Sequence, residues 1–126
     1  MNVKGKSSLF NFGPGFNTEK IEYSPSKMEN YLLNLDSDKG KSKAQFLKDV
    51  LGYNKGDGKK LHNALIDAIG GKEPSKVTKT DYGVKYEYDV KIGGKNGTTA
   101  KVIVVYQQDN DKDKYRIITL YPGKKE

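Results

Sequence analysis

The sequence offers few side chains for proton transfer, because it has no cysteine and a single histidine, His62. The lack of cysteine excludes disulfides, thiol catalysis and cysteine-based zinc or iron–sulfur sites, and one histidine excludes a histidine-pair zinc motif. Lysine, tyrosine and one histidine suffice for cutting RNA. The 2′-hydroxyl of RNA is an internal nucleophile, so a protein need only move a proton, stabilise the phosphorane and protonate the leaving oxygen. We therefore expect no metal and no cofactor.

His62 is the first candidate for moving that proton, because histidine is the side chain that titrates near neutrality. It follows Leu61, beside an apolar stripe of an expected helix. The alternative is a boundary histidine that packs against the rest of the fold.

The balance of charge favours an acidic partner such as nucleic acid or an acidic protein. The chain has 126 residues, with 23 Lys+Arg against 16 Asp+Glu and a net charge of +7. Arg116 is the only arginine, and its fork can hold a phosphate by two hydrogen bonds or form a cross-strand salt bridge. Lys39 and Lys41 are candidates for a phosphate-attracting entrance, or for a solvated loop. No apolar stretch reaches the roughly 18 residues of a membrane span, and the start lacks a secretory signal.

Three helices are expected in the first half of the chain. Residues 1–23, rich in Gly, Ser, Asn and Lys, are expected to form a flexible N-terminal arm or linker, and residues 24–126 a single domain. Ser24 and Pro25 predict the start of a short helix that has Met28, Tyr31 and Leu32 on one face. Apolar residues at spacings of three and four predict further helices over about 43–51 and 58–69.

After Pro74 the apolar period changes to two, which predicts strands. They are expected over 77–80, 84–92, 100–106 and 115–121, with a glycine-rich hairpin loop at 93–97. The strand over 100–106 is apolar on both faces and should be central. Helices followed by an antiparallel sheet of about four strands predict an α+β domain.

The last strand contains two more candidates. Thr119 and Tyr121 share one face, and we expect that face to line the cleft. In a regular strand Arg116 lies on the opposite face, so it joins them only if a bulge intervenes.

Short stretches in a fixed order carry a resemblance to a known family. They are Tyr31-Leu32-Leu33-Asn34, Gly40 with Lys43-Ala44-Gln45-Phe46, Leu51-Gly52-Tyr53, and the segments 82–86, 94–97 and 116–122. Over about residues 22–123 the chain resembles domains at the C-termini of bacterial polymorphic and contact-dependent growth-inhibition toxins. Those domains are similar to the superfamily of barnase, EndoU, colicin and RelE nucleases.

The resemblance implies an RNase toxin that cleaves tRNA and is neutralised by a dedicated immunity protein. It further implies export as the C-terminal part of a larger protein and action in the cytoplasm of target bacteria. Lys43 matches a lysine of the family and is expected to hold transition-state charge, while Thr119 hydrogen-bonds the scissile phosphate. The family often has a histidine in the loop after Tyr31-Leu32-Leu33. In this chain, residues 36–38 of that loop are Asp-Ser-Asp.

The net charge of +7 predicts that the immunity protein is acidic, and the toxin is expected to be monomeric apart from that complex. Two alternatives remain open. One is a nucleic-acid-binding or protein-binding module of the same fold without catalysis, and the other is a structural domain of a phage.

Overall fold

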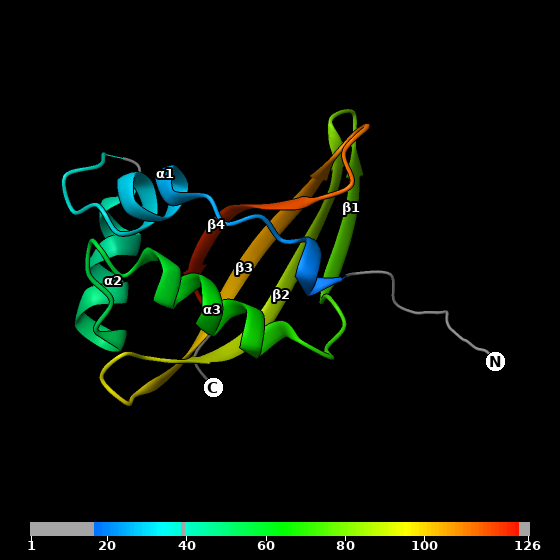
Figure 1. The fold of residues 1–126 in the computed structure, drawn as a ribbon. Coiled ribbons are helices and arrows are strands. Elements are labelled where there is room, and N and C mark those ends of the chain that lie inside the picture. Colours follow the sequence, from blue (N-terminus) through cyan, green and yellow to red (C-terminus); the bar gives the residue numbers. More distant parts are fainter. Residues whose placement is uncertain (1–16, 39, 124–126) are drawn as a thin grey trace.

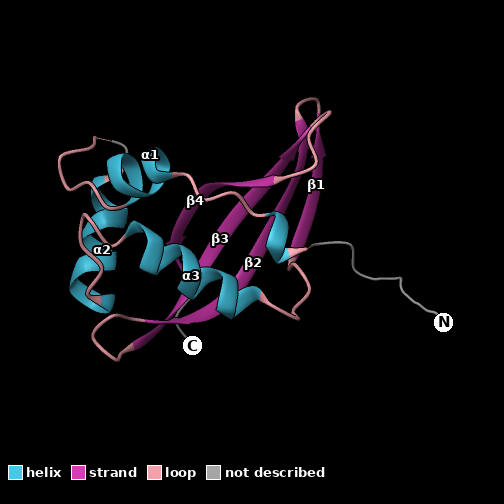
Figure 2. Cartoon of the chain, viewed as in Figure 1, coloured by secondary structure: helices cyan, strands magenta, loops and turns pink. Residues whose placement is uncertain are grey.

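The computed structural model describes residues 17–38 and 40–123, which form three helices on a four-stranded antiparallel sheet (Figure 1). The helices are α1 (Pro25–Lys27), which continues as a π-helical turn η2 (Met28–Leu32), α2 (Lys41–Leu51) and α3 (Gly58–Ile69). The strands are β1 (Lys76–Thr80), β2 (Gly83–Gly93), β3 (Thr99–Asp109) and β4 (Tyr115–Pro122). Figure 2 distinguishes the helices from the strands, and along the chain the three helices precede the sheet. The predicted α+β fold is confirmed.

The sheet is a meander in the order β1-β2-β3-β4. The apolar alternation of β2 is confirmed, because Tyr88, Val90 and Ile92 are buried on the face that meets the helices. β3 lies between β2 and β4, as its apolar residues predict. Leucines of α2 and α3 fill the space above these strands. This burial is the main favourable term in holding the two layers together.

Local signals place the helix ends well. Ser24 accepts a hydrogen bond from the backbone N–H of Lys27, and Pro25 is the first helical residue, as expected. Gly52 ends α2 in the left-handed conformation, with φ 78°. α2 begins at Lys41, two residues before the expected start. None of the helices in the described ranges is long and apolar enough to cross a membrane.

The packed domain begins earlier than residue 24. A 3-10 turn, η1 (Thr18–Lys20), leads to Ile21, which is 7% exposed and belongs to the core. Ile21 forms a parallel bridge with Tyr115, and the N–H of Glu22 donates to the carbonyl of Tyr115 at 2.8 Å. The expected arm therefore does not extend to residue 23, and residues 1–16 lie outside the described residues. A single apolar side chain in a polar stretch has no periodicity, so the sequence pattern missed this contact.

Candidate functional site

A tyrosine and a threonine from opposite ends of the domain meet at the edge of the sheet. The hydroxyl oxygens of Tyr31, in η2, and Thr119, in β4, lie 3.3 Å apart, within hydrogen-bond distance. Both side chains are half-buried. The contact joins residues separated by 88 positions in the chain, so it depends on how the helices pack against the sheet.

Two lysines lie over the ring of this tyrosine. The Nζ atom of Lys27 is 4.8 Å from the ring centroid of Tyr31, and that of Lys43 is 5.7 Å from it. The hydrogen bond with Thr119, together with hydrogen bonding and charge from Lys43 and the charge of Lys27, lowers the pKa of Tyr31 from its ordinary value despite partial burial. The cluster of Lys27, Tyr31, Lys43 and Thr119 is the candidate site.

Gly40 explains how α2 comes so close to Tyr31. A Cβ atom at position 40 would overlap the backbone carbonyl oxygen of Tyr31 and would lie 3.2 Å from its ring. Glycine therefore lets the first turn of α2, with Lys41 and Lys43, lie beside η2. That turn contains no acidic residue, so both lysines add to the positive end of the helix dipole. The resulting positive potential favours an anion next to Tyr31.

A bulge in β4 brings Arg116 to the same face as Thr119 and Tyr121. Arg116 pairs with Gln107, whereas Thr119 pairs with Val105 and Tyr121 with Ile103, because the register shifts between Val105 and Tyr106. Directly paired residues point to the same side of a sheet. A regular strand would separate Arg116 from Thr119, and the bulge that was the one exception to this expectation is present. The extra residue in β4 reverses the alternation between the two positions.

We call the sheet face that carries Lys85, Gln107, Arg116 and Thr119 the polar face. A groove of about 660 Å³ lies on it, and Lys27, Lys85 and Arg116 are among its lining residues. Since Lys27 also lies over the Tyr31 ring, the groove adjoins the candidate site. Arg116 forms a fork with Asp109, its Nε and Nη2 atoms donating at 2.7 and 3.1 Å. This is the cross-strand salt bridge that was the alternative for Arg116.

The structure separates His62 from the candidate site. Its side chain is 7% exposed, and its ring centroid lies 5.2 Å from that of Tyr23. Burial, and secondarily the charge of Lys59, lowers the pKa of His62. No contact among the described residues joins His62 to Tyr31, Lys43 or Thr119. The geometry matches the packing alternative.

The remaining predicted residues differ in position. Lys41 is exposed at the start of α2, and Tyr121 is partly exposed on the polar face. Lys39 lies outside the described residues. Within 17–38 and 40–123, no three His, Asp or Glu side chains group closely enough to hold a metal ion.

Tyr31 and Lys27 were not predicted as site residues from the sequence. Tyr31 appeared as a helix-face residue beside Met28 and Leu32, which is the pattern of a packing side chain. Its place in the Tyr31-Leu32-Leu33-Asn34 stretch, which belongs to the family resemblance, is the signal that could have identified it as a site residue.

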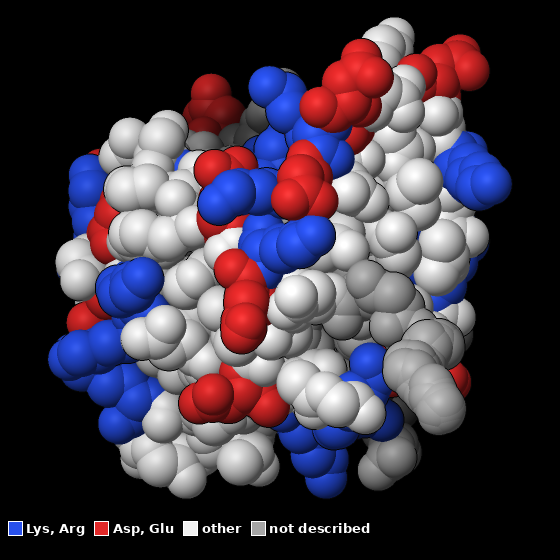
Figure 3. Space-filling view, turned by 45° about the vertical axis from the view of Figure 1, so that its right-hand side comes forward, with Lys and Arg blue, Asp and Glu red and all other residues white. Residues whose placement is uncertain are grey.

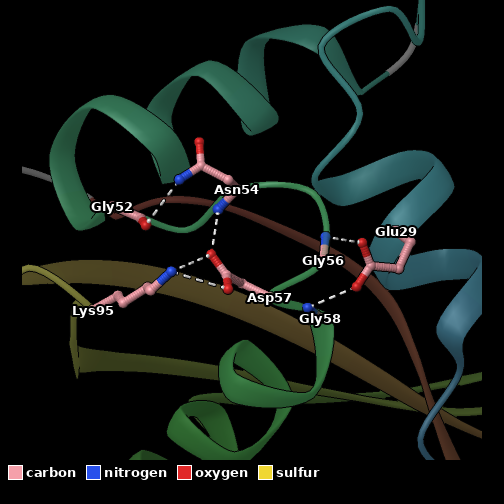
Figure 4. Close-up of polar contacts among 7 residues, drawn as sticks. All are labelled: Glu29, Gly52, Asn54, Gly56, Asp57, Gly58 and Lys95. Carbon is pink, nitrogen blue, oxygen red and sulfur yellow. Dashed lines mark hydrogen bonds and ion pairs between the residues drawn. The ribbon is translucent and has the colours of Figure 1, made fainter.

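A second polar cluster supports the helices around the site (Figure 4). The carboxylate of Glu29, in η2, accepts hydrogen bonds from the backbone N–H groups of Gly56 at 2.5 Å and Gly58 at 2.7 Å. Asp57 accepts from the N–H of Asn54 at 2.9 Å and from Lys95 at 3.2 Å. These bonds tie the loop before α3 to η2 and to the β2–β3 hairpin, so they hold η2, and with it Tyr31, in place.

Charge is mixed on the face of the molecule seen in Figure 3. Basic and acidic side chains alternate across it, and acidic side chains gather near the top. The net charge of +7 is therefore not spread as one basic field over this face.

Comparison with known proteins yields a family and no named relative. No curated protein and no solved structure matches this chain. A family model described as a domain of unknown function, DUF6883, matches residues 16–124. That range includes η1 and Ile21, in agreement with their place in the packed domain. With nearly its whole length matched, the chain belongs to the DUF6883 family.

Proposed function

We propose that this domain is a metal-independent RNase toxin that cleaves tRNA and is neutralised by an acidic immunity protein. It is exported as the C-terminal part of a larger protein and acts in the cytoplasm of target bacteria. The observation that carries the proposal is the Tyr31–Thr119 hydroxyl pair beneath two lysines. The resemblance to toxin domains supports the biological role.

The cluster contains the groups that RNA cleavage requires. The phenolate of Tyr31 takes the proton of the 2′-hydroxyl, whose oxygen attacks the adjacent phosphorus while the bond to the 5′-oxygen breaks. A lowered pKa makes the phenolate more abundant near neutral pH than in an ordinary tyrosine. The Lys27 ammonium protonates the departing 5′-oxygen, which leaves a 2′,3′-cyclic phosphate and a free 5′-hydroxyl.

The other two groups stabilise charge. Lys43 neutralises the non-bridging oxygens, which gain negative charge in the phosphorane. Thr119 donates its one hydroxyl proton to the Tyr31 phenolate and so orients it. Once Tyr31 has taken the substrate proton, the Thr119 hydroxyl is free to donate to the phosphate. His62 has no part in this scheme, because its contacts are with Tyr23 and Lys59.

Induced expression in bacteria, with total RNA separated on a gel, tests the proposal. The wild-type domain should arrest growth and produce discrete tRNA fragments, and purified protein should cut RNA equally well with a chelator present. Lys43→Ala should lower the cleavage rate ~10²–10³-fold, the usual cost of removing a group that stabilises transition-state charge.

The matched control is Lys48→Ala, which removes an exposed lysine from the same helix. This variant should remain fully toxic. Growth arrest with intact RNA would exclude the RNase, and undisturbed growth would favour the non-catalytic binding module.

A further inference from the structure

An exposed tyrosine stands at the rim of the groove on the polar face. Tyr82, in the turn between β1 and β2, is 78% exposed and lines the groove together with Lys27, Lys85 and Arg116. An aromatic ring so exposed contributes little to the core. Its position therefore calls for another explanation.

The turn that carries this ring is tightly held. The N–H of Tyr82 donates to Oγ1 of Thr80 at 3.1 Å, and that hydroxyl donates to the carbonyl of Gly83 at 3.0 Å. Asn110, in the turn between β3 and β4, donates its N–H to the carbonyl of Tyr82 at 2.9 Å and its side-chain amide to the carbonyl of Asp81 at 2.7 Å. The two turns lie together at one end of the sheet (Figure 1). The backbone of Tyr82 is thus fixed while its ring faces solvent.

Gly83 adds to this rigidity. A Cβ atom there would overlap the backbone carbonyl oxygen of Gln108, so the turn packs directly on β3. With its backbone already held, Tyr82 loses only side-chain conformational entropy when a ligand stacks on its ring, and a tyrosine side chain has few torsions to lose.

Charges along the groove give it a direction. Two half-buried lysines line the groove. Lys27 lies next to Tyr31, and Lys85 lies on β2. Arg116 neutralises Asp109, and Gln107, 5% exposed, donates to the same carboxylate at 2.5 Å. The turn between β3 and β4 carries Asp111 and Asp113 together with Lys112 and Lys114, so it has no net charge. Phosphates therefore favour Lys27 and Lys85, whereas an uncharged base needs no counter-charge beside Tyr82.

We propose that the groove is a nucleobase subsite in which Tyr82 stacks on an unpaired base of the RNA while Lys27 and Lys85 hold the adjoining phosphates. This assignment rests on the proposed function and specifies its substrate: an RNA loop, because a base within a duplex cannot leave its stack to reach Tyr82 without breaking its pair. Because of the bulge, Arg116 and Thr119 pair with residues only two positions apart on β3, so they lie about 7 Å apart along the strand on one face. The base subsite and the cleavage site thus adjoin one another.

The test measures binding separately from cleavage. A fluorescent RNA hairpin with an unpaired loop, methylated at every 2′-oxygen, cannot be cut because its internal nucleophile is blocked. Its affinity for the full chain is compared with that of a fully paired duplex. Tyr82→Ala should weaken hairpin binding about tenfold, the range found for loss of one base–aromatic stack, while Tyr82→Phe should stay within about twofold.

The matched control is Val77→Ala, which removes an apolar side chain that is 53% exposed on β1 and faces the other side of the sheet. It should bind the hairpin like the wild type. With unmethylated RNA, Tyr82→Ala should raise KM and leave kcat nearly unchanged, because stacking acts equally on substrate and transition state.

The outcomes separate this proposal from the RNase proposal. Wild-type affinity of Tyr82→Ala for the hairpin overturns the base subsite, even if RNA is cleaved. Binding that depends on Tyr82 without any cleavage overturns the RNase and supports the subsite. Equal affinity for hairpin and duplex, unchanged in Tyr82→Ala, overturns the subsite as well.

Discussion

Tyr31 illustrates how neighbouring groups, as well as residue type, determine which side chain is a candidate for proton transfer. His62 has the more suitable ordinary pKa, yet the fold buries it against Tyr23 and lowers that pKa further. Tyr31 has an unsuitable ordinary pKa, but Thr119, Lys43 and Lys27 lower it. The group nearest to the lysines and the sheet edge is therefore the better candidate for the base.

The first prediction concerns Tyr31→Phe, which keeps the ring and removes the hydroxyl. If the phenolate is the base, the wild-type cleavage rate should rise with pH until Tyr31 is deprotonated. Tyr31→Phe should lose ~10²–10⁴-fold in rate and lose this rise, a loss typical of general base catalysis. Single-turnover cleavage from about pH 6 to pH 9 measures both effects.

Two companion variants sharpen that experiment. Thr119→Val removes the hydrogen bond to Tyr31, so the rise should move to higher pH; Thr119→Ser keeps a hydroxyl and should restore the wild-type profile. His62→Gln should leave the profile unchanged. A profile that vanishes in His62→Gln but persists in Tyr31→Phe would return proton transfer to His62.

Among the elements, the loop between α2 and α3 holds η2, which contains Tyr31, by hydrogen bonds to Glu29. Glu29 extends from η2 to the N-terminus of α3, where its carboxylate accepts two backbone N–H groups. Asp57 connects the same loop to Lys95 in the β2–β3 hairpin. The position of η2 over β4 thus depends on polar contacts as well as on the buried leucines.

The second prediction uses the pH dependence of stability. The N–H of Asn54, and then Lys95, lower the pKa of Asp57. The contribution of Asp57 to the free energy of unfolding should be complete above its pKa in the unfolded chain, about 3.9. It should be lost as the pH falls through the lower pKa of Asp57 in the folded protein. Asp57→Asn should cost about 1–3 kcal/mol at pH 7, the usual range for a buried hydrogen-bond partner lost, and much less at about pH 2.

Urea unfolding at the two pH values measures this difference. The exposed Asp67→Asn, on α3, is the control and should cost little at either pH. A cost for Asp57→Asn that is the same at pH 7 and pH 2 would show that the ionised carboxylate contributes no stability.

For the whole molecule, the net charge of +7 is the property most relevant to partners. Figure 3 shows that acidic side chains interrupt the basic ones on one side, so a partner that is attracted electrostatically has preferred directions of approach. The groove on the polar face has three basic residues and one carboxylate among its lining, and we propose it as the docking region for the acidic immunity protein.

The third prediction concerns that inhibitor. If an acidic immunity protein covers the groove, its association rate should fall at least about tenfold between ~50 and ~300 mM salt, because screening removes electrostatic steering. Lys85→Ala should lower the rate at low salt and flatten the dependence. Stopped-flow fluorescence measures the rates, and a flat wild-type profile would mean that uncharged contacts drive association.

Local sequence signals determined the elements of this protein. Periods of 3.6 and 2, the Ser24–Pro25 start and the glycine-rich loop at 93–97 act over a few residues, so they predicted the helices, the strands and the α+β order. The resemblance and the face of the last strand made Lys43 and Thr119 candidates, although not Tyr31, which contacts both.

Tertiary structure alone decided the composition of the site. The bulge in β4 adds one residue without any signal in composition, and it moved Arg116 to the face of Thr119. The contact between Tyr31 and Thr119 spans 88 positions, and Gly40 allows α2, with Lys43, to lie close to Tyr31. Contacts between elements lower the pKa of Tyr31, and other contacts between elements place His62 against Tyr23. Periodicity assigns a residue to a face of its own element, whereas the residues that meet across elements depend on how those faces pack.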